Sequence, residues 1–390
     1  MARRKHSTPP RPIAPGDVVT TYSEILGEWT AAQITHVDAD NELAAVLELD
    51  WSGPEPSSVA DLGSPSALRL THHSWNGRVS HCNFEWVLPR SYKVIGNLPL
   101  LGPAQSSSYS GGWHIGANLA RQRHWDAGHR ESLPTPHALR SSGEEITRLF
   151  DEDTEPRSDV RGLTVSDIDA LDCARLVAHF PRLTALSMSG DLGVLSNASS
   201  LNELTSLRHV FIVDLFGMTK DDRLLPRRLP ELESLYLSGI PADYAAAMRS
   251  SWHTEIPFGT YVEIRKGRKP EWVTENRDNP LRDWDGRRHI SNATYKKAIA
   301  QYKLTRRAAL AAASDADADD LPGRLHEIGR DYAEAFNRLD TRTGFIETVE
   351  REELFSALYV IMDDAERSLG TDLTLAREAL ASGAESARDW

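Results

Sequence analysis

The sequence predicts an α+β protein built from more than one domain, and three observations carry this prediction. Short stretches rich in β-branched and aromatic residues follow one another from Gly16 to about Leu98. A second set of apolar residues recurs with one spacing through the middle of the chain. Beyond Ser291, apolar residues recur at helical spacing. Because these patterns occupy separate stretches, we expect the stretches to fold as separate domains.

Composition bounds the class of protein. The 390 residues carry a formal net charge of −13, with 40% hydrophobic and 26% charged residues, which is typical of soluble proteins and leaves room for about two or three domains. No apolar run approaches the roughly 18 residues of a membrane span, and two cysteines, Cys82 and Cys173, give no disulfide framework. We therefore expect a soluble cytoplasmic protein, with residues 1–15 as a disordered basic tail.

Residues 16–101 are expected to form a small β-domain. The stretches GDVVTTY, EWTAAQITHV and LAAVLELDW read as strands, and Asn76-Gly77 is the dipeptide that best tolerates the positive φ of a tight hairpin. Five or six short strands in so short a region resemble a small SH3-like barrel, an architecture found in proteins that bind peptides, nucleic acids or nothing at all. Residues 102–159 hold several loop-forming clusters and are expected to be a linker region with short helices.

Two groups of potential metal ligands lie in the N-terminal half. They are His72, His73, His81 and Cys82 in the first group, and His114, His124, His129 and His137 in the second. Imidazole and thiolate suit zinc, but neither group has the close paired spacing of a structural zinc site. We therefore expect no metal and no cofactor here. A metal-dependent hydrolase that uses these histidines is the alternative.

The middle of the chain repeats one apolar frame, L-x-x-L-x-L. The copies LTALSMSG and LESLYLSG, which begin at Leu183 and Leu232, read almost alike. The second position of the frame is occupied in turn by Leu163, Leu186, Val210, Leu235 and Val262. Leu163 and Leu186 are 23 residues apart, and Leu235 and Val262 are 27 apart. A repeat of this length and frame resembles the leucine-rich repeat family over about residues 160–265. The resemblance implies a solenoid over residues 160–268 with one strand per unit.

The chain departs from the family pattern just after the strands. The family commonly carries asparagine there, whereas this chain has Asp191, Leu215 and Ile240. The side-chain ladder that asparagine provides is therefore expected to be absent. A short α/β layer of the same topology remains the expectation.

Side chains alternate along a strand, so the residues between the leucine positions are expected on the opposite face of the repeat. Three columns result: Ala185, His209, Ser234 and Tyr261; then Ser187, Phe211, Tyr236 and Glu263; then Ser189, Val213, Ser238 and Arg265. Exposed aromatic clusters are typical of interface anchors. The predicted partner-binding residues are therefore His209, Phe211, Val213, Tyr236 and Tyr261. The alternative is that the linker or the C-terminal helices cover this face.

Two further segments, residues 269–291 (KPEWVTENRDNPLRDWDGRRHIS) and 336–353 (FNRLDTRTGFIETVEREE), resemble segments of actinobacterial leucine-rich repeat proteins labelled "gliding motility protein". No residue here bears on motility. The resemblance implies a bacterial scaffold or adaptor within a self-defence or toxin-immunity locus. Trp272 and Trp284, in residues 269–290, are expected to cap the open end of the solenoid. An exposed binding pair is the alternative.

Residues 291–390 are expected to form about four helices, with Ser291 as the N-cap of the first. Residues 265–307 are basic and lie between two acidic regions. We expect cations of this segment to pair with the acidic C-terminal helices, and nucleic-acid binding through the segment is the alternative. The cations in question are Lys296, Lys297, Arg306 and Arg307.

Two acidic stretches invite comparison with catalytic or calcium sites. SDADADDLPG carries Asp320 where a calcium loop needs glycine and His326 where it needs glutamate, so a solvated linker is expected. The glutamates between Glu347 and Glu353 are expected to mark an acidic helix start. No phosphate-binding loop, dinucleotide fingerprint, nucleophile elbow or H-E-x-x-H motif occurs. These features favour a non-enzymatic interaction protein whose partner is another protein and not a membrane.

Overall fold

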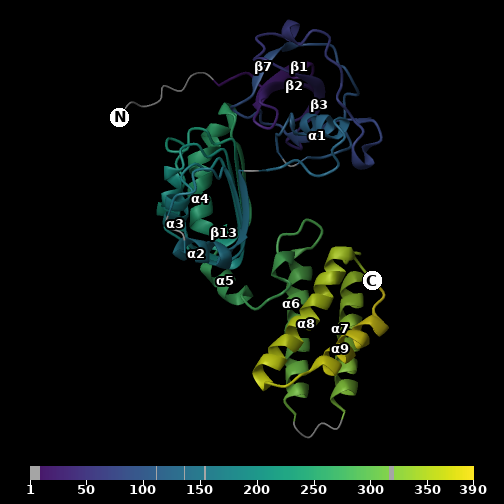
Figure 1. The fold of residues 1–390 in the computed structure, drawn as a ribbon. Coiled ribbons are helices and arrows are strands. Elements are labelled where there is room, and N and C mark those ends of the chain that lie inside the picture. Colours follow the sequence, from purple (N-terminus) through teal and green to yellow (C-terminus); the bar gives the residue numbers. More distant parts are fainter. Residues whose placement is uncertain (1–8, 111, 136, 153–154, 316–319) are drawn as a thin grey trace. The chain divides into compact units, whose positions relative to one another are not determined.

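The computed structural model describes residues 9–110, 112–135, 137–152, 155–315 and 320–390. The chain divides into two compact units, Met1–Lys269 and Pro270–Trp390. The first unit contains an antiparallel sheet and a parallel sheet, and the second unit is helical (Figure 1). The expected succession of strands, a mixed layer and helices is confirmed. Residues 1–8 of the expected tail and 316–319 of the acidic linker lie outside the described residues.

Five strands form the antiparallel sheet, in the order β6-β3-β2-β1-β7. They are β1 Asp17–Ser23, β2 Glu28–Asp38, β3 Leu43–Gly53, β6 His81–Glu85 and β7 Lys93–Asn97. The short elements η1 Val59–Leu62, β4 Arg69–Leu70, η2 His73–Trp75 and β5 Arg78–Val79 lie between β3 and β6. Among the described residues the sheet does not close into the expected barrel, because the short strands β6 and β7 stand at its two edges.

Both faces of this sheet are covered. Val19 belongs to the core on one face and its neighbour Val18 to the core on the other, so β1 buries consecutive residues instead of alternating ones. The first part of the expected linker completes this packing. It forms α1 Ala117–Asp126, whose Leu119 packs with Leu70 beneath the short strands.

Six parallel strands form the second sheet, in the order β14-β12-β11-β10-β9-β8. They are β8 Ala138–Ser142, β9 Gly162–Asp172, β10 Ala185–Ser196, β11 His209–Phe216, β12 Ser234–Ser238 and β14 Tyr261–Ile264. The second-position residues of the frame pair directly across neighbouring strands, from Leu163 to Val262. The sheet begins earlier than the repeat, because β8 comes from the expected linker and pairs with β9.

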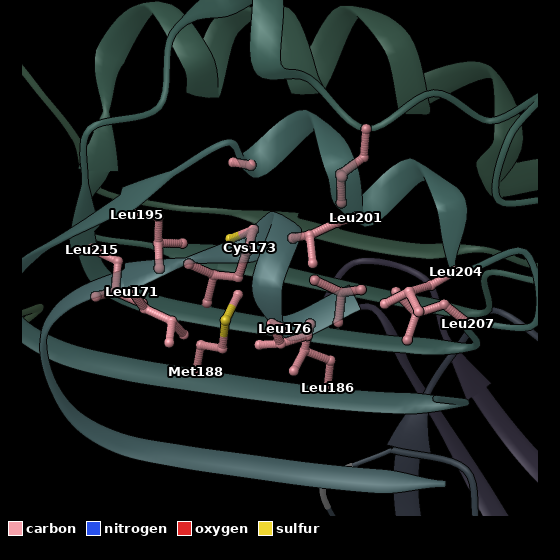
Figure 2. Close-up of a cluster of buried hydrophobic side chains, with 14 of the residues drawn as sticks. Leu171, Cys173, Leu176, Leu186, Met188, Leu195, Leu201, Leu204, Leu207 and Leu215 are labelled. Atoms are coloured by element: carbon pink, nitrogen blue, oxygen red, sulfur yellow. The ribbon is translucent and has the colours of Figure 1, made fainter. Parts of the chain in front are cut away.

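Helices lie on one side of the parallel sheet (Figure 1). They are α2 Gly143–Glu152, α3 Cys173–His179 and α4 Ala242–Trp252. Three short 3-10 helices, labelled η, accompany them: η3 Ala198–Glu203, η4 Lys220–Asp222 and η5 His253–Phe258. Figure 2 shows Leu186 and Met188 of β10 pointing toward Leu176 of α3. Full burial of one such side chain contributes about 1.5–3 kcal/mol, so the repeated frame builds one continuous core from units that could not bury it alone.

A residue with left-handed backbone conformation follows the apolar frame in three copies of the repeat. Asp167, Asp214 and Gly239 have φ of 53°, 50° and 63° and stand two residues after the last apolar position of their copies. A Cβ atom on Gly239 would lie 1.8 Å from Oδ1 of Asp214, so only glycine fits there. The next residues, Leu215 and Ile240, are fully buried. Leu215 and Ile240 thus make apolar contacts in the core, whereas Asp191, at the equivalent position of the copy that begins at Leu183, is exposed. The two-residue strands β13 Ile240–Pro241 and β15 Gly267–Arg268 pair beside this bend.

The second unit consists of helices around one apolar core. They are α5 Pro270–Asn276, α6 Asn292–Ala313, α7 Leu321–Asp340, α8 Thr348–Leu369 and α9 Thr374–Ala387, with the turn η6 Arg282–Trp284. Ser291 Oγ accepts the N–H of Thr294 at 3.1 Å, as expected of an N-cap. Asp320 Oδ1 accepts the N–H of Gly323 at 2.9 Å at the start of α7.

Trp284 lies in this core and is fully buried. Its ring meets Phe336 and Phe345 edge-on, with centroids 6.2 and 5.6 Å away. Trp272 donates from Nε1 to Asp285 Oδ2 at 2.8 Å. These contacts all lie inside the second unit, so Trp284 is a core residue of the helical unit and not the expected cap of the repeat. Burial of a large aromatic ring stabilises a protein most where the ring is fully enclosed, and the helices of the second unit enclose the ring of Trp284.

Candidate functional site

The face of the parallel sheet that points away from the helices carries the predicted site, and we call it the outer face. It comprises Ala185, Ser187, Ser189, His209, Phe211, Val213, Ser234, Tyr236, Ser238, Tyr261 and Glu263. The register aligns these residues side by side in the columns that the frame predicts. Four of them are serines and one is alanine, so the aromatic side chains stand out.

Phe211 and Tyr236 form the centre of the outer face. They lie opposite each other on β11 and β12, and their rings stack with centroids 4.6 Å apart and planes 8° apart. Phe211 is 40% exposed, and Tyr236 is half-buried. Two rings held by neighbouring strands present a rigid apolar surface, and a rigid surface loses little entropy when it binds.

The other three predicted residues surround this pair. His209 is exposed and Val213 is half-buried, and both flank Phe211 on β11. Tyr261 is half-buried on β14, at the edge of the sheet. The structure thus places His209, Phe211, Val213 and Tyr236 on two adjacent strands, with Tyr261 at the border of the outer face.

Three carboxylates gather around Tyr261, and we call Glu42, Glu85 and Glu263 the acidic corner. The Tyr261 hydroxyl donates to Glu263 Oε2 at 3.0 Å. Burial raises the pKa of Tyr261, and the charges of Glu263, Glu85 and Glu42 raise it further. Burial also raises the pKa of Glu85, and repulsion from Glu263 adds to the increase. Arg265 forms an ion pair with Glu263.

The loop before β7 fastens this corner to the repeat. Nη2 of Arg90 donates to Glu255 Oε2 at 2.6 Å and to Thr260 Oγ1 at 2.7 Å. The N–H of Ser91 donates to Glu233 Oε1 at 2.7 Å. The side chains of Arg90 and Glu255 are largely buried, where charge-assisted hydrogen bonds are strong. The acidic corner is therefore a fixed feature of the first unit.

The first histidine group is part of the N-terminal packing. His81 Nε2 lies 2.8 Å from Thr35 Oγ1, and burial lowers the pKa of His81. His72 and His73 approach each other through their Nδ1 atoms at 3.1 Å. Burial raises the pKa of the Cys82 thiol. Within the described residues these side chains do not converge as three ligands of one ion.

The second group is divided. His114 and His137 hydrogen-bond to nearby backbone carbonyls at 2.8 and 2.9 Å. By contrast, the rings of His124 and His129 stack on each other.

Part of the basic segment is neutralised within the second unit. Arg306 Nη2 lies 3.0 Å from Asp364 Oδ2, which confirms the expected pairing for this residue. Arg287 Nη1 lies 2.6 Å from Glu350 Oε1. Three other cations form no ion pair with any described residue: Lys296, Lys297 and Arg307. The segment therefore offers a nucleic acid fewer free charges than its composition indicates.

Comparisons with known proteins find no family model, curated protein or solved structure that matches this chain. Over the described part of the chain, no helix has the length and apolar character needed to cross a membrane. The function must therefore be inferred from the chemistry of the site.

Sequence reasoning located the aromatic pair but missed the acidic corner. Phe211 and Tyr236 follow from a local repeat, whereas Glu42 and Glu85 belong to the N-terminal sheet and reach Tyr261 only through folding. No spacing in the sequence links these carboxylates to Glu263. Their juxtaposition depends on the contacts that fasten the two sheets together.

Proposed function

We propose that this chain is a non-enzymatic protein–protein interaction scaffold or adaptor that binds its partner on the outer face. The stacked and exposed pair of Phe211 and Tyr236 carries the proposal. Aromatic side chains that a partner can enclose dominate the binding energy of many interfaces. The small polar residues around the pair supply the rim that such an anchor requires.

The fold that we propose behind this face is a leucine-rich repeat solenoid. Its support is one strand per unit, a frame in register across β9 to β14, and the buried Leu215 and Ile240 in place of an asparagine ladder. Solenoids of this kind bind partners on the extended surface that their strands or loops create. For the N-terminal region, the five-stranded antiparallel sheet supports an SH3-like fold as the second module.

The acidic corner supports an expectation about the partner's chemistry. Burial and the neighbouring charge of Glu263 both disfavour the ionised form of Glu85, so a cation placed there would relieve repulsion. We therefore expect a protein segment with an apolar or aromatic side chain for the Phe211–Tyr236 pair and a lysine or arginine for the corner. Such complementarity raises the rate of association at low ionic strength.

Pull-down from native lysate tests the proposal. The full chain, the double variant Phe211→Ala/Tyr236→Ala and the control Tyr22→Ala/Tyr109→Ala serve as baits. The control removes exposed aromatic residues of the N-terminal region. We expect one protein to be retained by the natural chain and the control but reduced more than about tenfold by the double variant, because two anchors each contribute about 1–2 kcal/mol or more.

Circular dichroism of the same baits makes the result interpretable. The double variant should melt nearly where the natural chain does, since its changed side chains lie on a solvated face. Equal retention of every protein by all three baits would contradict the proposal. A double variant that unfolds would instead show that the pair belongs to a core.

A further inference from the structure

A second place in the first unit gathers metal-binding side chains. His124 lies in the last turn of α1, and His129 and Glu131 follow in the next loop. Each offers one ligand atom, and the three atoms lie within 4.8 Å of one another. His129 Nδ1 is 3.2 Å from Glu131 Oε1, and His124 Nε2 is 3.5 Å from the same oxygen.

The end of α1 explains why the two histidines meet. Gly128 has a φ of 92°, and its N–H donates to the carbonyl of Trp125 at 3.0 Å. The N–H of His129 donates to the carbonyl of His124 at 3.2 Å. These are the two bonds of a Schellman motif, in which the residue after the left-handed glycine packs onto the last helical turn. Here that contact is made by two imidazole rings whose centroids are 4.5 Å apart.

The environment of the cluster favours a cation. His124 Nε2 is buried and has no hydrogen-bond partner among the described residues, a state that costs free energy. Glu131 places a carboxylate beside it. The carbonyl end of a helix adds negative potential at the same place. A bound ion would therefore coordinate a buried nitrogen that makes no hydrogen bond with a described residue.

We propose that His124, His129 and Glu131 bind a zinc ion, an inference that goes beyond the proposed interaction function. Two imidazole nitrogens and one carboxylate oxygen suit Zn²⁺ and leave a fourth position for water. Ca²⁺ and Mg²⁺ bind through oxygen ligands, so two nitrogens disfavour both.

One ligand is fixed and two can adapt. The side chain of His124 is 20% exposed, whereas those of His129 and Glu131 are 55% and 65% exposed. The stacked rings cannot both direct a lone pair at one ion, so the ring of His129 turns toward it on binding. Its exposure leaves room for this rotation.

Calorimetric titration with ZnCl₂ tests the proposal on untagged full chain freed of metal with a chelator. We expect one zinc per chain, and His124→Ala and His129→Ala should each weaken binding by at least about tenfold, since even residues that only support metal ligands cost that much. Glu131→Gln should also weaken it. His253→Ala removes an exposed histidine on another element and should leave binding unchanged. Visible absorption of the Co²⁺ form should show tetrahedral coordination in the natural chain only.

Two further measurements separate a zinc site from a hydrogen-bonded cluster. Zinc affinity should fall as the pH decreases, because protons compete with the metal ion for the imidazole nitrogens. Gly128→Ala keeps all three ligands but strains the turn that unites them, so it should also weaken zinc while the chain stays folded. Absence of stoichiometric zinc in the natural chain would overturn the proposal, and so would equal losses for His253→Ala and His124→Ala. Either result would leave the three side chains as a cluster in which the Glu131 carboxylate lies beside two imidazole rings.

Discussion

The parallel sheet and the helical unit both have apolar cores, but they differ in where charged side chains lie relative to the core. The sheet sorts its residues by face, with leucines inward and polar or aromatic side chains outward. The helical unit places a charged network against its core instead. Glu350 is only 3% exposed and pairs with Arg287, which also pairs with Glu353, and Trp284 Nε1 donates to Glu353 Oε2 at 2.8 Å.

This difference shows where each region is vulnerable. In the sheet, the position of a side chain in the frame determines whether it is buried in the core or lies on the outer face. Neighbouring residues along one strand therefore lie on opposite faces. In the helical unit, a charge that loses its partner remains buried, and this is costly in a medium of low polarity. Single substitutions should therefore give graded effects in the first region and large effects at a few polar positions in the second.

The largest expected effect is that of Arg287→Ala. It removes the guanidinium from buried Glu350, which keeps His289 Nε2 at 3.1 Å as a partner, and should lower the free energy of unfolding of the helical unit by about 3–5 kcal/mol. Hydrogen exchange of the α8 amides reports this unit within the full chain. Arg330→Ala is the matched control, because its pair with Glu327 is exposed at both partners and should contribute less than about 1 kcal/mol. Equal protection in the two variants would contradict the expectation.

The same network should make the helical unit sensitive to acid. Burial acts to raise the pKa of Glu350, but hydrogen bonds from Arg287 and the backbone outweigh it, so the pKa lies below the usual 4.5. A lowered pKa in the folded state stabilises the fold above the unfolded pKa, and this contribution disappears as the pH falls through the folded value. The stability gap between the natural chain and Glu350→Gln should therefore narrow below about pH 4.5. A gap that stays constant there would show that Glu350 is not the titrating group.

Two neighbours on β12 test the sorting of faces in the sheet. Leu235 is fully buried, so Leu235→Ala should cost about 2–5 kcal/mol in urea denaturation. Tyr236→Ala, on the outer face, should cost no more than about 1.5 kcal/mol, which is the value of an aromatic stack. The difference between adjacent residues serves as its own control. Similar losses for both variants would mean that the outer face is packed like the core.

The smallest expected effect concerns the basic segment. Arg306 is partly exposed in its pair with Asp364, so Arg306→Glu should lower stability by about 1 kcal/mol or less at low salt. At high salt the effect should shrink, because ions screen exposed charges. Arg307→Glu is the matched control, since Arg307 forms no ion pair with a described residue. A salt dependence equal in the two variants would show that general charge, not this pair, is responsible.

Local periodicity in the sequence by itself determined where the strands of the repeat and the long C-terminal helices lie along the chain. The frame from Leu163 to Val262 specified which residues of the repeat point inward, because alternation along a strand depends only on the backbone. For the same reason, the helical spacing after Ser291 located the four long helices. The Phe211–Tyr236 pair was predictable because identical frames in neighbouring units place equivalent residues side by side.

Only the tertiary structure decided what lies next to what across long stretches of chain. It left the N-terminal sheet open, added β8 to the repeat, enclosed Trp284 among helices and brought Glu42 and Glu85 to Tyr261. It also joined Arg287 to Glu350, which no pattern in the sequence connects. Such contacts depend on how whole helices and strands pack against one another. They stabilise the protein only after segments that are distant in sequence have come together. The contact between His124 and His129 depends on both the local sequence and the folded structure. Gly128 is a local sequence signal for the end of a helix, but only the folded turn shows that one imidazole ring stacks on the other.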